Sequence, residues 1–121
     1  MPLRRITSQT GSFRDHYLRF AKVTGNAEML EFLPFLEEAC AGEEVWGLTS
    51  MHTIWLLAGD GSGSWLISIE HHGRGFQVSY LIPPADAPFD NAFVTGRRAD
   101  AREAAELVRL ALRLCGGWGG A

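Results

Sequence analysis

The sequence predicts a two-layer α+β domain, with a mainly antiparallel sheet of about 4–5 strands and helices packed on one face. Two helical hydrophobic periods come first in the chain, within residues 12–42. A block of alternating, strand-like runs with glycine turns follows, and a third helical period lies at 100–115. This order places helices near both ends of the chain and an antiparallel sheet between them.

The chain fits a single domain over residues 1–121. At 46% hydrophobic residues, it can bury one core without needing a metal or a disulfide. Residues 1–11 show no hydrophobic period and predict a loose N-terminal arm. Residues 116–121, GGWGGA, predict a flexible C-terminal tail, because paired glycines end the last helix.

Capping patterns mark the starts of the predicted helices. Ser12 followed by Asp15 resembles a capping box, and the aromatic residues after it fall at helical spacing. Asn26 predicts the cap of a second helix, which Pro34 should kink or split because proline lacks the amide hydrogen. Asp100 opens the last helix in the same way.

Two runs predict neighbouring strands in the first half of the sheet. Residues 45–49, VWGLT, are a short candidate, and residues 52–58, HTIWLLA, are a longer one with apolar side chains on both faces. A strand that is apolar on both faces is typical of a central position. The glycine-rich residues 59–63 predict a hairpin loop, and 92–96 a further strand after the proline-rich connection 83–91.

The stretch SIEHHGRGFQVSY, residues 68–80, predicts a hairpin of defined register. With Gly73 and Arg74 at the centre of a type II′ turn, the numbers of opposed residues sum to 147. On one side this register opposes apolar residues in four pairs: Trp65 with Ile82, Ile67 with Tyr80, Ile69 with Val78, and His71 with Phe76. A slip by one residue would oppose apolar and polar side chains along the whole ribbon.

The four histidines do not form a metal-binding pattern. No pair has the spacing that aims two rings at one ion, and His71 and His72 point to opposite faces of their strand. We predict no metal and no cofactor, and leave open a spatial trio of His52, His71 and Asp60. The loop GDGSGS lacks the Lys-Ser/Thr of a P-loop, and no nucleophile elbow occurs. No catalytic residue is predicted, so an enzyme is the less favoured interpretation.

Cysteine usage and hydropathy favour a cytoplasmic protein. Cys40 and Cys115 each fall near the end of a predicted helix, as buried thiols do, and a disulfide between them is the less favoured alternative. The longest uncharged apolar run, 51–59, is too short for a membrane span, and residues 1–10 lack the apolar centre of a signal peptide. A single lysine among abundant arginine, alanine and glycine indicates a GC-rich bacterial source.

Charge is concentrated in one acidic stretch. The net charge of −3 is too small to indicate nucleic-acid or membrane binding. Residues 28–44 hold six acids and no base, among them Glu37, Glu38, Glu43 and Glu44. This stretch is either a solvated helix face or a docking surface for a basic protein partner.

The four tryptophans divide into two groups. Trp55 and Trp65 occupy strand positions and are expected in the core, between sheet and helices. Trp46 and Trp118 are flanked by glycine or lie near a chain end. They are candidates for an exposed aromatic contact, since tryptophan is enriched at interface hot spots. Together with His71 and the four glutamates named above, they are the predicted binding residues.

The favoured function is a non-catalytic protein-binding module, either an immunity protein that blocks a toxin or an adaptor that holds a secreted effector. The acidic stretch and the lack of a catalytic pattern support it. The predicted architecture is similar to that of small immunity proteins of bacterial toxin systems and, more distantly, of type III secretion chaperones. The likeness lies in architecture and not in a motif, and the chain lacks the helix that those chaperones place between groups of strands.

Two other functions remain open. One is a small-molecule binding protein or enzyme, with a pocket lined by His52, His71 and Tyr80. The other is a self-associating structural domain, in which an edge strand pairs with a second copy or an arginine stripe meets its acidic helix; the stripe is Arg102, Arg109 and Arg113. Convergence of the pocket residues would favour the first, and salt-sensitive dimerisation the second.

Overall fold

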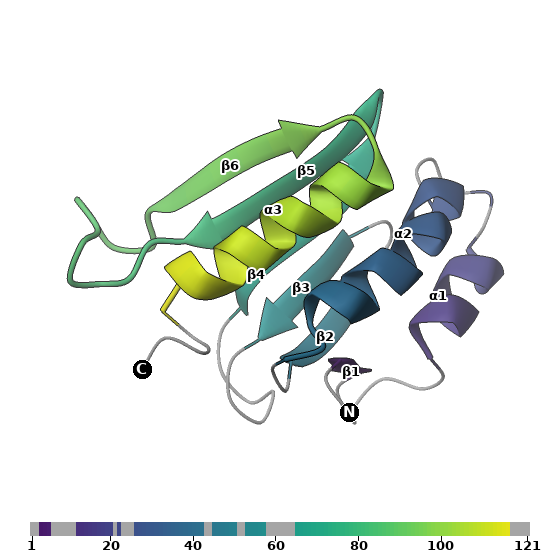
Figure 1. Cartoon of the computed structure of the whole chain (residues 1–121), viewed down its shortest axis with the longest axis horizontal. Coiled ribbons are helices and arrows are strands. Elements are labelled where there is room, and N and C mark those ends of the chain that lie inside the picture. Colours follow the sequence, from purple (N-terminus) through teal and green to yellow (C-terminus); the bar gives the residue numbers. More distant parts are fainter. Residues whose placement is uncertain are drawn as a thin grey trace.

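The computed structural model describes residues 3–5, 12–20, 22, 26–42, 45–50, 53–57 and 65–116. Within them the chain forms, in order, β1 (Leu3–Arg5), α1 (Phe13–Arg19), α2 (Asn26–Ala39), β2 (Val45–Ser50), β3 (Thr53–Leu57), β4 (Trp65–His72), β5 (Gly75–Leu81), β6 (Phe93–Arg98) and α3 (Ala101–Leu114). The three helices lie on one face of the sheet (Figure 1). The predicted α+β class, with a mainly antiparallel sheet, is confirmed.

The strands lie across the sheet in the order in which they occur in the chain. Strands β2 to β6 are each antiparallel to their neighbours, while the short β1 runs parallel to β2. The predicted central place of β3 is confirmed, because it has neighbours on both sides and lies away from both edges. Strand β6 forms the edge at the other end of the sheet.

The core lies between the sheet and the helices. Alternate residues of β3, β4 and β5 face it, among them Ile54, Ile67, Ile69 and Val78. Helix α3 packs tightly against β6, where a Cβ on Gly96 would meet Leu107 Cδ2 at 2.8 Å. The absence of a side chain at position 96 therefore lets this helix lie against the edge of the sheet.

The predicted caps at Ser12 and Asp100 are confirmed, whereas Asn26, predicted as the cap of the second helix, is the first residue inside α2. The Ser12 hydroxyl accepts from the Asp15 amide, and the Asp15 carboxylate accepts from the Ser12 amide, each at 3.1 Å. At α3, the Asp100 carboxylate accepts from the Glu103 amide at 2.8 Å. That backbone hydrogen bond is the main reason why the pKa of Asp100 is lowered. The caps satisfy amides that have no partner inside the first helical turn.

Helix α2 runs without a break through Pro34, so of the two predicted outcomes, a kink or a split, the split does not occur. Asn26, the first residue of the helix, is fully buried. Its side-chain amide donates to the carbonyl of Phe20 at 2.7 Å. This bond joins the start of α2 to the end of α1, so the two helices are fixed to one another at their junction.

The hairpin of β4 and β5 has the predicted register. Ile67 opposes Tyr80 and His71 opposes Phe76, so opposed residue numbers sum to 147. Gly73 has a φ of 64°, whereas Arg74 does not have a positive φ. This combination fits the predicted type II′ turn and excludes type I′, which needs a positive φ at both positions.

The expected chain ends are described only in part. Within the predicted loose arm, Leu3–Arg5 form β1, and Leu3 lies opposite Val45, so this part of the arm belongs to the sheet. At the other end, Gly116 follows α3 with a φ of 80°. The remaining arm residues 6–11 and the tail residues 117–121 lie outside the described residues.

Candidate protein-binding face

The sheet has a second face, turned away from α1, α2 and α3, which we call the open face (Figure 1). Its side chains alternate with the core residues along β2 to β6. Cross-strand pairing arranges them in three rows that run across the strands. One outer row is apolar, the middle row is mixed, and the other outer row is polar.

The apolar row consists of Trp46, Leu57, Trp65, Leu81 and Phe93. Trp46 opposes Leu57, which in turn opposes Trp65, and Leu81 opposes Phe93 at the edge. The ring centroids of Trp65 and Phe93 are 6.5 Å apart, and Phe93 is 58% exposed. The row therefore extends from β2 to β6 as a band of large apolar side chains, all with solvent access except Leu57, which is buried among them.

The middle row contains Leu48, Trp55, Ser68, Ser79 and Thr95. The ring of Trp55 meets that of Trp65 edge to face, with centroids 5.1 Å apart. This contact extends the apolar row into the centre of the face. Towards the β6 edge, the hydroxyls of Ser79 and Thr95 are hydrogen-bonded at 2.8 Å.

The polar row contains Thr53, Glu70, Gln77 and Arg97. Glu70 accepts hydrogen bonds from the Thr53 hydroxyl at 3.4 Å and from the Gln77 amide at 3.2 Å. A carboxylate held by its neighbours in this way has a defined direction. The open face therefore combines an apolar band with a fixed polar border along one side.

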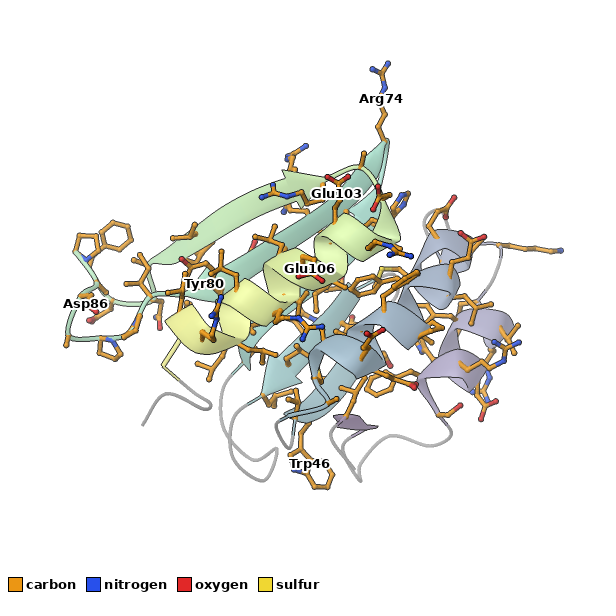
Figure 2. All side chains as sticks on the ribbon, in the orientation of Figure 1. Trp46, Arg74, Tyr80, Asp86, Glu103 and Glu106 are labelled. Atoms are coloured by element: carbon orange, nitrogen blue, oxygen red, sulfur yellow. The ribbon has the colours of Figure 1, made fainter. Side chains whose placement is uncertain are left out.

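The structure places Trp46 on this face, as a half-buried side chain of β2. In Figure 2 its ring projects away from the ribbon, at the end of the molecule opposite Arg74. Leu48, two residues further along β2, is also half-buried and lies opposite Trp55. The expectation that Trp46 offers an aromatic contact therefore remains, now with apolar neighbours around it.

The expected core positions of Trp55 and Trp65 are wrong. Trp55 alternates with the buried Ile54 and Leu56, so it points to the open face. Trp65 follows it there because the register between β3 and β4 shifts at Leu57. Trp65 opposes Leu57 on the open face, instead of Ile82 on the core side as we predicted from an uninterrupted register.

The acidic residues Glu37 and Glu38 are exposed on α2, close to arginines of their own chain. Glu37 borders a hollow that Arg14 of α1 also lines. Glu38 borders another with Arg102 and Arg109 of α3. The arginine stripe thus lies beside the acidic helix of the same chain, and this proximity weakens the acidic field that we predicted for a basic partner.

His71 is buried at the end of the core side of β4, as the register predicts, and is 8% exposed. Its ring meets that of Phe76 edge to face, with centroids 4.7 Å apart. Its Nδ1 has no hydrogen-bond partner among the described residues and lies 4.0 Å from Oε2 of Glu28 on α2. His71 therefore closes the core at this end, beside Glu28 of α2.

The predicted pocket of His52, His71 and Tyr80 is not assembled in the part that the structure describes. Tyr80 opposes Ile67, four residues before His71 along β4, which corresponds to about 13 Å of strand. In Figure 2, Tyr80 lies towards the end of the sheet that is away from Arg74. His52 lies outside the described residues, so the trio with Asp60, which is also outside them, is not described.

Several other predicted positions also fall outside the described residues. These are Glu43 and Glu44 of the acidic stretch, Trp118 of the tail, and the glycine-rich loop at 59–63. Within the described residues, no three side chains of histidine, cysteine, aspartate or glutamate converge as metal ligands. No described helix is both long and apolar enough to cross a bilayer.

Cys40 and Cys115, at the ends of α2 and α3, are buried thiols in the core. Burial raises the pKa of the Cys40 thiol to about 12. Because the thiolate is the reactive form, Cys40 stays protonated and inert near neutral pH. The thiol therefore contributes to packing, as we expect from its place near a helix end.

Comparisons with known proteins found no match to this chain. No protein family model, no curated protein and no solved structure matches the chain. The open face is accordingly defined by its own geometry. The sequence analysis did not predict the open face as a site. Its signal is present in residues 54–57, where apolar side chains alternate between the two faces of the strand.

Proposed function

We propose that this chain is a non-catalytic protein-binding module that holds its partner on the open face, in the manner of an immunity protein or an adaptor. The observation that carries the proposal is the apolar row, which remains accessible while the opposite face is covered by helices. Apolar surface of this extent on a soluble domain is typical of an interaction site. Tryptophan and phenylalanine are also among the residues that contribute most to binding energy.

The dimensions of the apolar row suit a helix. It crosses five strands, and at about 4.8 Å between strands it is about 19 Å long, the length of a helix of about 13 residues. On the core side of the same sheet, α2 and α3 have 14 residues each and run along the strands (Figure 1). A partner helix with an apolar stripe would instead lie across the strands, along the apolar row.

The polar row of the open face would set the orientation of the partner helix. The polar row lies along one side only, with Glu70 held by Thr53 and Gln77. A basic side chain of the partner would gain a charge-assisted hydrogen bond at Glu70 only if its helix lay with its polar side towards that row. A basic partner, which we first inferred from the acidic stretch at residues 28–44, would thus be recognised by Glu70 on the open face.

The test uses a displayed library of amphipathic helices of about 13 residues, selected against the purified protein. Selected helices are then measured against the double variant Trp46→Ser with Leu48→Ser. Both side chains are half-buried on the open face, so their loss should leave the fold intact. We expect affinity to fall at least tenfold, with circular dichroism unchanged.

The matched control is Glu37→Lys with Glu38→Lys, which reverses the exposed acids of α2 on the other side of the molecule. This variant should bind the selected helices as the unmodified protein does. The opposite pattern, with binding lost only in the α2 variant, would place the docking surface on the acidic helix. A selection that enriches no helix would contradict the proposal.

A further inference from the structure

The outer edge of β6 is one of the two edges of the sheet that the described residues form. Strand β6 is last in the sheet order, so no described strand lies beyond it. The amide of Ile82 donates to the carbonyl of Ala92 at 2.9 Å, so this carbonyl faces β5, while the amide of Ala92 donates to the carbonyl of Phe89. Because these groups alternate along a strand, Phe93, Thr95 and Arg97 direct theirs outwards. Phe93 and Thr95 thus offer amide donors and carbonyl acceptors to another strand. Arg97 offers its amide, while its carbonyl already accepts from the guanidinium of Arg98 at 2.6 Å and has one lone pair left.

This edge lacks most of the features that normally prevent strand addition. It has six residues, and it contains no proline. Its pairing with β5 runs from Phe93 to Arg98 without a bulge. Phe93 and Val94 are 58% and 41% exposed. Natural sheets protect a free edge by shortening it, bulging it or placing proline or charge along it, and here only the end at Arg97 and Arg98 is charged.

The charges around β6 fit a second copy of the same strand. Asp86 and Asp90 are exposed before the strand begins, and Arg97 and Arg98 are exposed where it ends. When two such strands pair in antiparallel fashion about a twofold axis, the acidic start of each lies near the basic end of the other. The three residues with outward-facing backbone groups are also evenly spaced, because Phe93 and Arg97 each lie two positions from Thr95. A twofold axis at Thr95 therefore brings Phe93 of one copy opposite Arg97 of the other.

We propose that two copies of this chain pair through β6 in antiparallel register, with Thr95 opposite Thr95 of the second copy. Phe93 of each copy then opposes Arg97 of the other on the open side, where a guanidinium can stack on the exposed ring. The outward backbone groups of the three residues then all lie opposite partners, and the Arg97 carbonyl, already bonded to Arg98, accepts through its second lone pair. The result is one continuous sheet across both copies.

The dimer would also change the proposed binding surface. Directly opposed residues of antiparallel strands place their side chains on the same face. The two open faces therefore lie side by side, with all helices on the other side of the joined sheet. A dimer of this kind presents two partner sites on one surface, but its formation does not depend on whether the open face binds a partner.

The first experiment is disulfide trapping. Opposed residues of a hydrogen-bonded antiparallel pair have Cα atoms about 5.5 Å apart, which is within disulfide range. The variant Thr95→Cys should form a covalent dimer under mild oxidation. In the control Arg97→Cys the two new thiols lie about 14 Å apart, four residues along the paired strands, and should not join. The native thiols Cys40 and Cys115 are buried and give little background.

The second experiment separates the backbone from the side chain. Thr95→Pro and Thr95→Val both remove the hydroxyl bonded to Ser79, but only proline removes the outward amide. By light scattering across protein concentration, the unmodified chain and Thr95→Val should be dimers and Thr95→Pro a monomer, with circular dichroism confirming that all are folded. The proposal would be overturned if the unmodified chain stayed monomeric at millimolar concentration. It would also be overturned if the Thr95→Pro variant still formed the dimer.

Discussion

The rings of Trp55 and Trp65 meet edge to face on the open face, with centroids 5.1 Å apart. Their contact depends on the register shift at Leu57, which turns Trp65 away from the core. Two indoles at this distance and angle couple electronically. We therefore expect an excitonic signal in the far-ultraviolet circular dichroism of the native protein.

Replacing either Trp55 or Trp65 by phenylalanine should remove this signal, because the coupling needs both indoles. The two single-variant difference spectra should have the same shape, and the double variant should add little to either. Trp46→Phe is the control and should leave the couplet in place. Different shapes for the two single variants would mean that the rings do not meet.

The second prediction concerns the close approach of β5 and β6 at Gly75 and Arg98. A Cβ at position 75 would meet the carbonyl oxygen of Arg98 at 2.6 Å, and this backbone atom cannot rotate away. We expect Gly75→Ala to lower the free energy of unfolding by about 1–3 kcal/mol, as overpacking does. Gly42→Ala is the control, because nothing lies within 4 Å of its added Cβ. Chemical denaturation of both variants measures the difference, and equal stabilities would contradict the close approach.

His71 tests whether a buried imidazole stabilises or weakens the core. Its Nδ1 is buried without a hydrogen-bond partner among the described residues, while its ring packs on Phe76. The variant His71→Phe keeps an aromatic contact and removes the unsatisfied nitrogen. We expect it to unfold at the same or higher denaturant concentration, with a gain of up to about 1 kcal/mol.

The matched control is Ile69→Ala, two residues earlier on the same side of β4, which should cost about 2–5 kcal/mol. Urea denaturation at one pH compares both variants with the unmodified chain. A clear loss of stability in His71→Phe would show that the imidazole makes a stabilising polar contact after all.

Burial of the Cys40 thiol leads us to expect that the protein loses stability at alkaline pH. Its pKa in the folded protein is about 12, against a usual value near 9, so the folded state retains a proton that the unfolded state loses. The contribution of this thiol to stability is fully present below pH 9 and declines as the pH rises towards 12. Urea denaturation between about pH 8 and 11 should therefore show a steeper decline in the unmodified chain than in Cys40→Ala. Parallel curves would contradict the raised pKa.

The hairpin of β4 and β5 could be predicted from the turn as far as the pair of Ile67 and Tyr80, but not at Trp65. Its alternation has a period of two, and only one turn position keeps apolar residues opposite one another, so the local pattern determines the register. The capping box at Ser12 and the N-cap at Asp100 were predictable for the same reason, since a cap involves residues only three positions apart. These features depend on neighbours in the sequence.

Features that depend on distant parts of the chain were not predictable. The pairing of Leu3 with Val45 brings together residues from separate segments, and nothing in LRR marks a strand. The register shift at Leu57 reverses the direction of Trp65, although its sequence alternation with Ile67 points to the core. Since the candidate site is built on that reversal, sequence reasoning identified Trp46 but not the face around it.

The order of the strands also has a consequence for how this chain folds. Each of β2 to β6 pairs with the strand next to it in the sequence, so most of the sheet can grow by short loop closures, beginning at the tight turn of Gly73 and Arg74. Strand β1 alone must close a loop of about forty residues, from Leu3 to Val45, for three paired positions. We expect β1 to join last, and its amides to exchange with solvent far faster than those of the β4–β5 ribbon, which is the most persistent part of the sheet.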